Sequence, residues 1–270
     1  NTILGDKDFT GDGNGARTGL VRNVLEGGYP VAVKTGTSLE ELFTSNSTYP
    51  EREANHLFLK STYDETGYYE YSCFDTSAFL MQEDGTGAVP SAEGYPGVYD
   101  FSVYQELVSP GSSPTKKTYW RGNFLPYDMV DVNDRKVRNL YDGGLNPLPA
   151  DDPRYNENIY VQQSTDYYFG LSLETTFMIP ENGCDKNGNP LIFEFNGDDD
   201  FWLFIDDVLV IDLGGIHNAL TGKVDFSTGI VSTYNGYNSN TYSYTTLMDS
   251  FRNAGVFPDG SPWDESQIHE

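Results

Sequence analysis

The stretch 193–225 constrains the fold of this chain more than any other. Two runs of aromatic and branched residues, Phe201–Ile205 and Val208–Ile211, are separated only by Asp206 and Asp207. Apolar runs joined by two turn-forming residues are typical of an antiparallel β-hairpin. The sequence therefore predicts two paired strands with a two-residue turn at Asp206 and Asp207.

The pairing predicts which residues share an end of this hairpin. If Ile205 pairs with Val208, Trp202 lies opposite Ile211 and Phe201 lies opposite Asp212. Asp212 then returns to the end of the hairpin that carries 198–200, while the turn lies about 15 Å away at about 3.3 Å per residue.

Carboxylates therefore gather at one rim of the predicted sheet. Asp198, Asp199 and Asp200 precede the hairpin and Asp212 ends it. His217 and Asn218 follow shortly after the two glycines at 214 and 215. Crowded carboxylates repel each other unless a proton or a cation lies between them, and calcium is the cation that prefers oxygen ligands. We expect Ca²⁺ on these four aspartates, with His217 and Asn218 as further ligand-binding candidates. The alternative is that some of the aspartates cap turns.

Composition favours an all-β fold. The chain has 20 Tyr and 16 Phe for a core, and its 28 Gly and 14 Pro mark many turns, whereas long leucine- or alanine-rich helical patterns are missing. Short strands joined by loops fit this balance.

The net charge of −25, from 41 acidic and 16 basic residues, limits the partners. Binding to nucleic acid or to an anionic membrane needs clustered Lys and Arg, so both are excluded. The chain contains no run of 18 apolar residues, so the sequence predicts no membrane-spanning helix. Strong acidity is easier to sustain where millimolar divalent cations are present, which favours an extracellular or cell-wall location. The oligomeric state stays open.

Two cysteines, Cys73 and Cys184, lie outside any CxxC or metal-type spacing. The alternatives are two thiols or one disulfide, which would close a loop of about 110 residues and stabilise the fold by about 4–5 kcal/mol.

Local patterns predict further elements. Residues 1–19 form an irregular N-terminal segment, and short helices are expected at Ser38–Phe43, from a capping box, and at Thr246–Asn253. Residues 227–245, rich in Ser, Thr, Tyr and Asn, predict a long exposed excursion, with 232–244 resembling protein-binding loops in composition. The expected strands are Gly67–Ser72, Phe101–Leu107, Asn123–Leu125, Tyr167–Phe177 and Leu191–Phe195, the last two joined by a turn at Asp185–Pro190.

The motif GDDDFWLFIDDVLVIDLGGIH resembles the signature of the fibro-slime domain, a branch of the protective-antigen-type (PA-fourteen) lectin-like superfamily. The resemblance extends through NHLFLKSTYDETGYYEYS, GNFLP and YYFGLSLETTF, and covers most of residues 20–230. Proteins with this domain are typically large secreted or wall-attached adhesins of bacteria and social amoebae. The superfamily fold is a β-sandwich.

The resemblance implies an antiparallel β-sandwich over residues 20–270, with long loops and a few short helices. In the sugar-binding members, two consecutive aspartates joined by a cis peptide hold a calcium ion that contacts sugar hydroxyls. Carried over, these are Asp198 and Asp199. Asp207 stands where the family has Gly. The family's next strand, with a Glu-Arg motif, is not found before Glu270, so the sandwich is either cut at the C-terminal end or completed by a partner strand.

These observations lead to one functional prediction with one alternative. The prediction is a non-catalytic, calcium-dependent carbohydrate-binding module of a bacterial adhesin, with a carbohydrate or host glycoprotein as partner. The alternative is a structural or host-protein-binding segment, for example one that binds a glycoprotein or immunoglobulin, with a purely structural calcium. Catalysis is disfavoured because no GxSxG, HExxH or Cys/His arrangement occurs.

Overall fold

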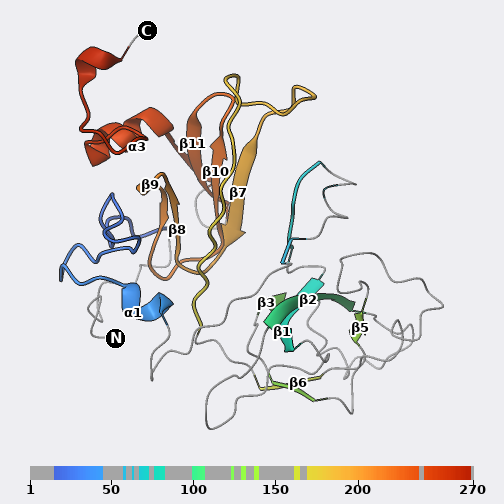
Figure 1. Ribbon diagram of the computed structural model, residues 1–270. Helices are drawn as coiled ribbons and strands as arrows, with labels where there is room; N and C mark the ends of the chain where they lie inside the picture. Colours follow the sequence, from blue (N-terminus) through green and yellow to red (C-terminus); the bar gives the residue numbers. More distant parts are fainter. Residues whose placement is uncertain are drawn as a thin grey trace. The chain divides into compact units, whose positions relative to one another are not determined.

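The computed structural model describes residues 15–44, 169–236 and 240–268, a few residues between 57 and 72, and the backbone of six strands between 76 and 164 (Figure 1). The chain divides into two compact units. Unit 1 joins residues 1–42 to 172–270, and unit 2 contains residues 43–171. Each is described by itself, and the single domain expected over 20–270 stays a prediction.

Unit 2 contains one four-stranded sheet and one pair of strands. The sheet has the order β3-β1-β2-β5, in which only β1 and β3 run parallel, and β4 pairs with β6. The predicted strands at 101–107 and 123–125 are confirmed. The one expected at Gly67–Ser72 is wrong, because these residues are not paired in a ladder and Tyr69 stacks on Tyr63 instead. The strands are β1 (Thr76–Gln82), β2 (Tyr99–Glu106), β3 (Asn123–Phe124), β4 (Met129–Asp131), β5 (Val137–Asn139) and β6 (Val161–Ser164).

Unit 1 is built on an antiparallel sheet with the order β12-β11-β10-β7 (Figure 1). Its strands are β7 (Ile192–Gly197), β10 (Leu220–Asp225), β11 (Ile230–Asn235) and β12 (Thr241–Thr246). The predicted second helix is confirmed as α3 (Leu247–Ala254), which begins at an N-cap Thr246 that accepts a hydrogen bond from the Asp249 amide. A 3-10 turn, η3, follows at Glu265–Gln267.

The predicted hairpin is confirmed as β8 (Phe201–Ile205) and β9 (Val208–Leu213). Asp206 and Asp207 have φ angles of 45° and 63°, as a two-residue type I′ turn requires. The predicted register holds only next to the turn. A bulge between Leu203 and Phe204 shifts the pairing by one residue, so that Trp202, rather than Phe201, lies opposite Asp212.

The core of unit 1 lies between this hairpin and the four-stranded sheet. Ile211 and Leu213 of β9 pack against Val224 of β10 and Val231 of β11, all of them at most 2% exposed. Gly222 of β10 makes room for this contact, because a Cβ there would lie 2.8 Å from the Ile211 Cγ2. The hairpin and the sheet therefore form two β layers around one apolar core.

The N-terminal segment of unit 1 follows the outer edge of β9. The Arg17 amide donates to the Gly214 carbonyl, the Leu209 amide donates to Asn23, and Val24 bridges Val208. Farther on, the short helix predicted at Ser38–Phe43 is confirmed as α1 (Glu40–Phe43), where the Ser38 hydroxyl accepts from the Glu40 amide.

Two predictions for unit 1 are wrong. Residues 169–177 form no strand, and Leu173 and Phe177 are exposed, because β7 pairs with β10 instead. Residues 227–245 are not a loop excursion, because most of them form β11 and β12. The turn predicted at Asp185–Pro190 is confirmed: Asp185 accepts from the Asn187 and Asn189 amides, and Cys184 bridges Pro190.

The all-β prediction is confirmed, since both units are built from mostly antiparallel sheets with few and short helices. Within the described residues, no helix is long and apolar enough to cross a membrane.

Candidate functional site

Asp212 is held inside the structure by hydrogen bonds. Its two oxygens accept from the Trp202 indole Nε1 at 3.0 Å and from the Gly19 amide at 2.6 Å. Burial raises the pKa of Asp212 above its usual range, and hydrogen bonds from Gly19, Trp202 and Gly214 oppose that rise. Asp212 thereby ties the N-terminal segment to both strands of the hairpin.

Asp198, Asp199 and Asp200 lie on the exposed rim beside this tie. Partial burial raises the pKa of Asp199, and the charge of Asp198 adds to the rise. Partial burial also raises the pKa of Asp200, which the amide of Gly215 opposes by donating a hydrogen bond. The prediction that these carboxylates lie at the same end of the hairpin as Asp212 is confirmed.

His217 is buried and engaged on both ring nitrogens. Its Nε2 lies 3.0 Å from the Leu213 carbonyl oxygen and its Nδ1 lies 2.9 Å from the Asn218 carbonyl oxygen. Carbonyl oxygens only accept hydrogen bonds, so the ring clamps the turn that follows β9. His217 therefore holds this turn in place, and the contact of Asn218 with it is through the backbone; the ligand-binding role of both residues stays a prediction.

These groups do not assemble a ready-made metal centre. Within the residues that the structure describes, no three His, Cys, Asp or Glu side chains converge to hold a metal ion. Asp212 and Asp200 already accept backbone N–H groups, which reduces what they can offer to a cation. Ca²⁺ stays a prediction, and the function proposed below does not depend on it. The cis peptide expected between Asp198 and Asp199 is wrong, since this bond is in the lower-energy trans form.

Cys184, the second cysteine of the predicted bridge, is half-buried, and its sulfur forms no disulfide with a described residue. Cys73 lies outside the described residues, so the disulfide stays a prediction.

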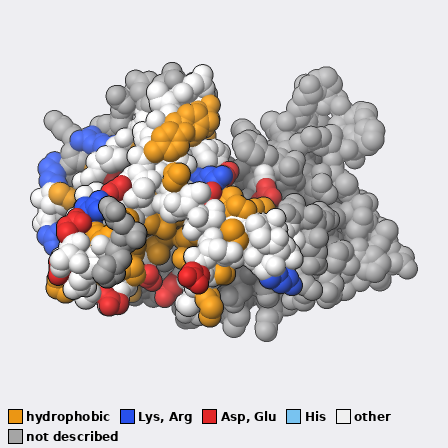
Figure 2. Space-filling model, turned by 90° about the horizontal axis from the view of Figure 1, so that it is seen from above, with side chains coloured by type: hydrophobic (Ala, Val, Ile, Leu, Met, Phe, Trp, Pro, Cys, Tyr) orange, Lys and Arg blue, Asp and Glu red, His pale blue; other side chains and the backbone are white. Residues whose placement is uncertain are grey.

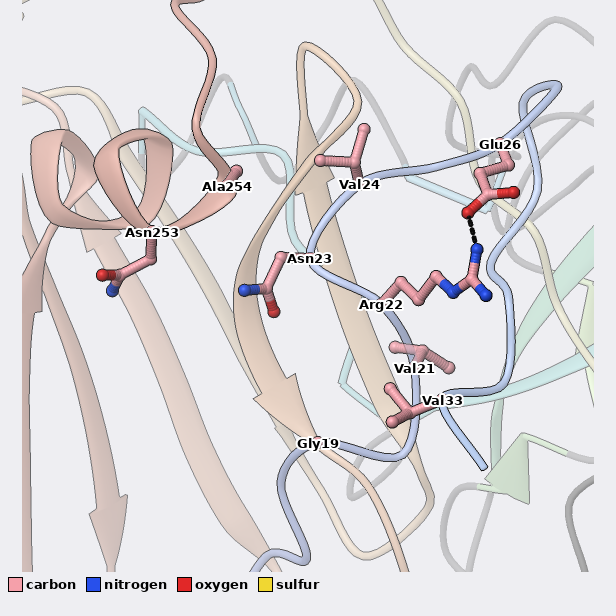
Figure 3. A pocket seen from close by; sticks show the side chains of 9 residues that line it. All are labelled: Gly19, Val21, Arg22, Asn23, Val24, Glu26, Val33, Asn253 and Ala254. Carbon is pink, nitrogen blue, oxygen red and sulfur yellow. Dashed lines mark hydrogen bonds and ion pairs between the residues drawn. The ribbon is translucent and has the colours of Figure 1, made fainter. Parts of the chain in front are cut away.

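A shallow hollow of about 510 Å³ lies between the segment 19–33 and the end of α3 (Figure 3). Its walls are mostly aliphatic. Arg22 and Glu26 point toward each other and form an ion pair there, and Asn23 and Asn253 supply amides. Since its one cation is already paired with its one carboxylate, the hollow offers no obvious nucleophile or acid–base pair.

A row of tyrosines on β11 and β12 lies in the segment 232–244 whose composition resembles protein-binding loops, but sequence reasoning missed that these residues form two strands with stacked rings. Tyr234 stacks on its cross-strand partner Tyr242 with ring centroids 4.2 Å apart, and Tyr242 stacks on Tyr244 at 5.9 Å. Tyr242 and Tyr244 are 57% and 68% exposed. The alternation of Tyr with Ser and Thr in TYSYTT was the available signal, because it places every second residue on one face of a strand.

The row lies on the face of the sheet that points away from the hairpin. Val231 faces the core, so Ser232 and Tyr234 point to the opposite face, together with their cross-strand partners Tyr244 and Tyr242. On the face of the molecule in Figure 2, exposed hydrophobic side chains of described residues lie among scattered acidic and basic ones. Exposed aromatic side chains that are already ordered by stacking are typical of binding surfaces.

The chain segment that carries the row is uncharged, and the nearest charged side chain on this face of the sheet is Lys223 of β10, opposite Ser232. From Phe226 to Met248 the sequence contains no Asp, Glu, Lys, Arg or His, although the whole chain has 57 acidic and basic residues. Within the described part of the chain, β12 pairs only with β11, so its other edge ends the sheet. All but the last residue of β12 are exposed.

Comparison with known proteins finds relatives in Dictyostelium discoideum. Protein psiB is 32% identical over 162 residues, which is 57% of this chain and 26% of psiB. Protein psiF is 26% identical over 241 residues, 84% of this chain and 24% of psiF. Protein psiG is 60% identical over 35 residues. The chain thus spans about a quarter or less of the length of these relatives. No protein-family model and no solved structure matches it.

These relatives correct the functional prediction. They are eukaryotic proteins, so the prediction of a bacterial adhesin module is wrong, and nothing in them supports calcium-dependent lectin activity or the host-protein-binding alternative. The fibro-slime resemblance itself stays a prediction.

Proposed function

We propose that this chain is a non-catalytic module that binds another polypeptide through strand β12. The observation that carries the proposal is the exposed, stacked row Tyr234, Tyr242 and Tyr244 on an uncharged strand at the edge of a sheet. Tyrosines supply large contact area at low cost in conformational entropy. An open strand edge adds backbone N–H and C=O groups that an extended polypeptide can pair with.

The direction of these backbone groups follows from the β11–β12 ladder. The Leu247 amide donates to the Gly229 carbonyl, which makes 247 and 229 a hydrogen-bonded pair. Such pairs alternate along an antiparallel ladder, so residues 241, 243 and 245 also point their backbone groups toward β11. Tyr242 and Tyr244 then direct their N–H and C=O groups to the open edge.

The acidic rim supports a non-catalytic role. The ring nitrogens of His217 both contact backbone carbonyls, and Asp212 accepts hydrogen bonds on both oxygens, so neither group is disposed to move protons to and from a substrate. We retain an extracellular location as part of the proposal, supported by the net charge of −25.

The test uses a defined probe, an eight-residue peptide. Its first and last residues are lysine, and threonine and tyrosine alternate between them. Added to ¹⁵N-labelled full chain, it should shift the amide resonances of Tyr242 and Tyr244 and slow their hydrogen exchange. The amide of Ser243, which already faces β11, should change little. The double variant Tyr242→Ser/Tyr244→Ser should lose the response, and Tyr68→Ser/Tyr69→Ser, two exposed tyrosines in unit 2, should keep it. A parent chain that shows no response at β12 would refute the proposal.

A further inference from the structure

We propose that the partner of β12 is a second copy of this chain, joined antiparallel edge to edge around a two-fold axis at Ser243. This inference rests on the proposed function, because it names the polypeptide that occupies the same edge.

Charge favours a second copy at this edge over the other edge of the same sheet. Two chains of net charge −25 repel each other, so their contact is least unfavourable where neither carries charge. The 23 residues from Phe226 to Met248 meet that condition. The other edge of the same sheet, β7, carries Glu194, which lies opposite Lys223. Charged side chains on an edge strand oppose pairing with a further strand.

The ladder alternation restricts the register of such a pair. Backbone groups that point outward must meet outward-pointing groups of the partner, so Tyr242 and Tyr244 can pair only with each other, with themselves or with Thr246. A two-fold axis must therefore pass through a residue and cannot pass between two residues.

Among these registers, the one centred on Ser243 matches like with like. It sets Tyr242 opposite Tyr244 of the second copy, Thr241 opposite Thr245, and Ser243 opposite itself. Aromatic pairs and Ser/Thr pairs are favourable cross-strand combinations. Directly opposite residues of an antiparallel pair point their side chains to the same face of the sheet. The tyrosine row of one copy would therefore continue into the tyrosine row of the other. A contact that uses the same patch on both copies closes as a dimer.

The area of one strand edge is small, so we expect a dissociation constant in the micromolar to millimolar range. Sedimentation equilibrium of the full chain at about 10 μM to 1 mM should show the mass rising from 30.1 kDa toward twice that value. High salt should strengthen the dimer, since it screens the repulsion between two acidic molecules while the contact itself holds no ion pair.

The register is tested by charge at position 243. Ser243→Lys places two lysines directly opposite each other, and Ser243→Glu does the same with two glutamates, so each should weaken self-association about fivefold or more. An equimolar mixture of the two variants should associate at least as tightly as the parent. Ser172→Lys, the same substitution at another exposed serine, is the matched control and should leave the parent's dissociation constant unchanged.

The outcomes separate this inference from the proposed function. A parent that stays monomeric at 1 mM, or a mixture of the two charge variants that does not recover association, overturns the second copy at this register. If that monomer still binds the threonine–tyrosine peptide at Tyr242 and Tyr244, the proposed function stands and the partner is another polypeptide. If it binds neither, both proposals fail.

Discussion

The two roles considered for Asp212 predict opposite effects of its removal. If Asp212 is a structural tie, Asp212→Ala destabilises unit 1, because the Trp202 Nε1 and the amide of Gly19 lose their acceptor. If it is an open metal ligand held among other carboxylates, its removal in chelator relieves repulsion and leaves stability unchanged or higher. The hydrogen bonds in the structure favour the first result.

The magnitude follows from the contacts. A hydrogen bond to a charged group contributes about 1.5–3 kcal/mol. The bond from Gly19 is exposed, so the bonds from Trp202 and Gly214 provide most of the loss. Removing a carboxylate whose pKa is raised by burial returns part of that free energy. We therefore expect Asp212→Ala to lower the free energy of unfolding by about 2 kcal/mol.

The assay is denaturant unfolding in chelator, followed by tryptophan fluorescence. Glu194→Ala, which removes an exposed carboxylate from β7, is the control and should change stability by less than about 0.5 kcal/mol. A double-mutant cycle of Asp212→Ala with Trp202→Phe should give a coupling of about 1 kcal/mol. In hydrogen exchange, the Arg17 amide should lose protection in Asp212→Ala, since the segment 15–25 is released from β9. A variant as stable as the parent, with Arg17 still protected, would refute the tie.

Three further results are expected. Gly222→Ala should lower the free energy of unfolding by about 1–3 kcal/mol, because its Cβ would lie 2.8 Å from the Ile211 Cγ2, and an unchanged denaturation midpoint would contradict the packing described here. Asp225→Asn should lower the free energy of unfolding at neutral pH, because hydrogen bonds from Ser227 hold the pKa of Asp225 below its usual range. The difference in stability between variant and parent should disappear as the pH falls through that lowered pKa. A difference in stability that persists in acid would contradict this cause. For the untested calcium prediction, titration calorimetry of chelator-treated protein should give a saturable heat that is lost in Asp198→Ala/Asp199→Ala, and a flat titration of folded parent would refute it.

The hairpin shows how far sequence reasoning reaches. Two apolar runs around Asp206 and Asp207 were enough to predict β8, β9 and their turn, because turn type follows from loop length. The bulge between Leu203 and Phe204 could not be predicted, since both runs stay apolar and either register buries them. The one-residue shift matters, because it places Trp202 opposite Asp212 and so creates the indole–carboxylate bond.

The strands β11 and β12 show where composition misleads. Ser, Thr, Tyr and Asn are common in loops, and this suggested an excursion over 227–245. Thr and Tyr also have high β-propensity, and a strand with polar side chains on both faces lacks the apolar alternation that marks a half-buried strand. The opposite error occurred at 169–177, where alternation is present but the described residues supply no partner strand.

The strand β12 lacks the features that usually protect the edge of a sheet. Natural proteins usually protect an edge strand with charge, proline or a bulge. None of these occurs in Thr241–Thr246, whereas the opposite edge carries Glu194. Among the described residues nothing pairs with the outer edge of β12, so this β-prone, uncharged edge is the place where pairing with other chains is favoured. Either the edge is occupied in the working protein, or the overall charge of −25 keeps copies apart. Salt distinguishes the two: screening should reveal a discrete dimer that stops at two copies in the first case and progressive, open-ended aggregation in the second.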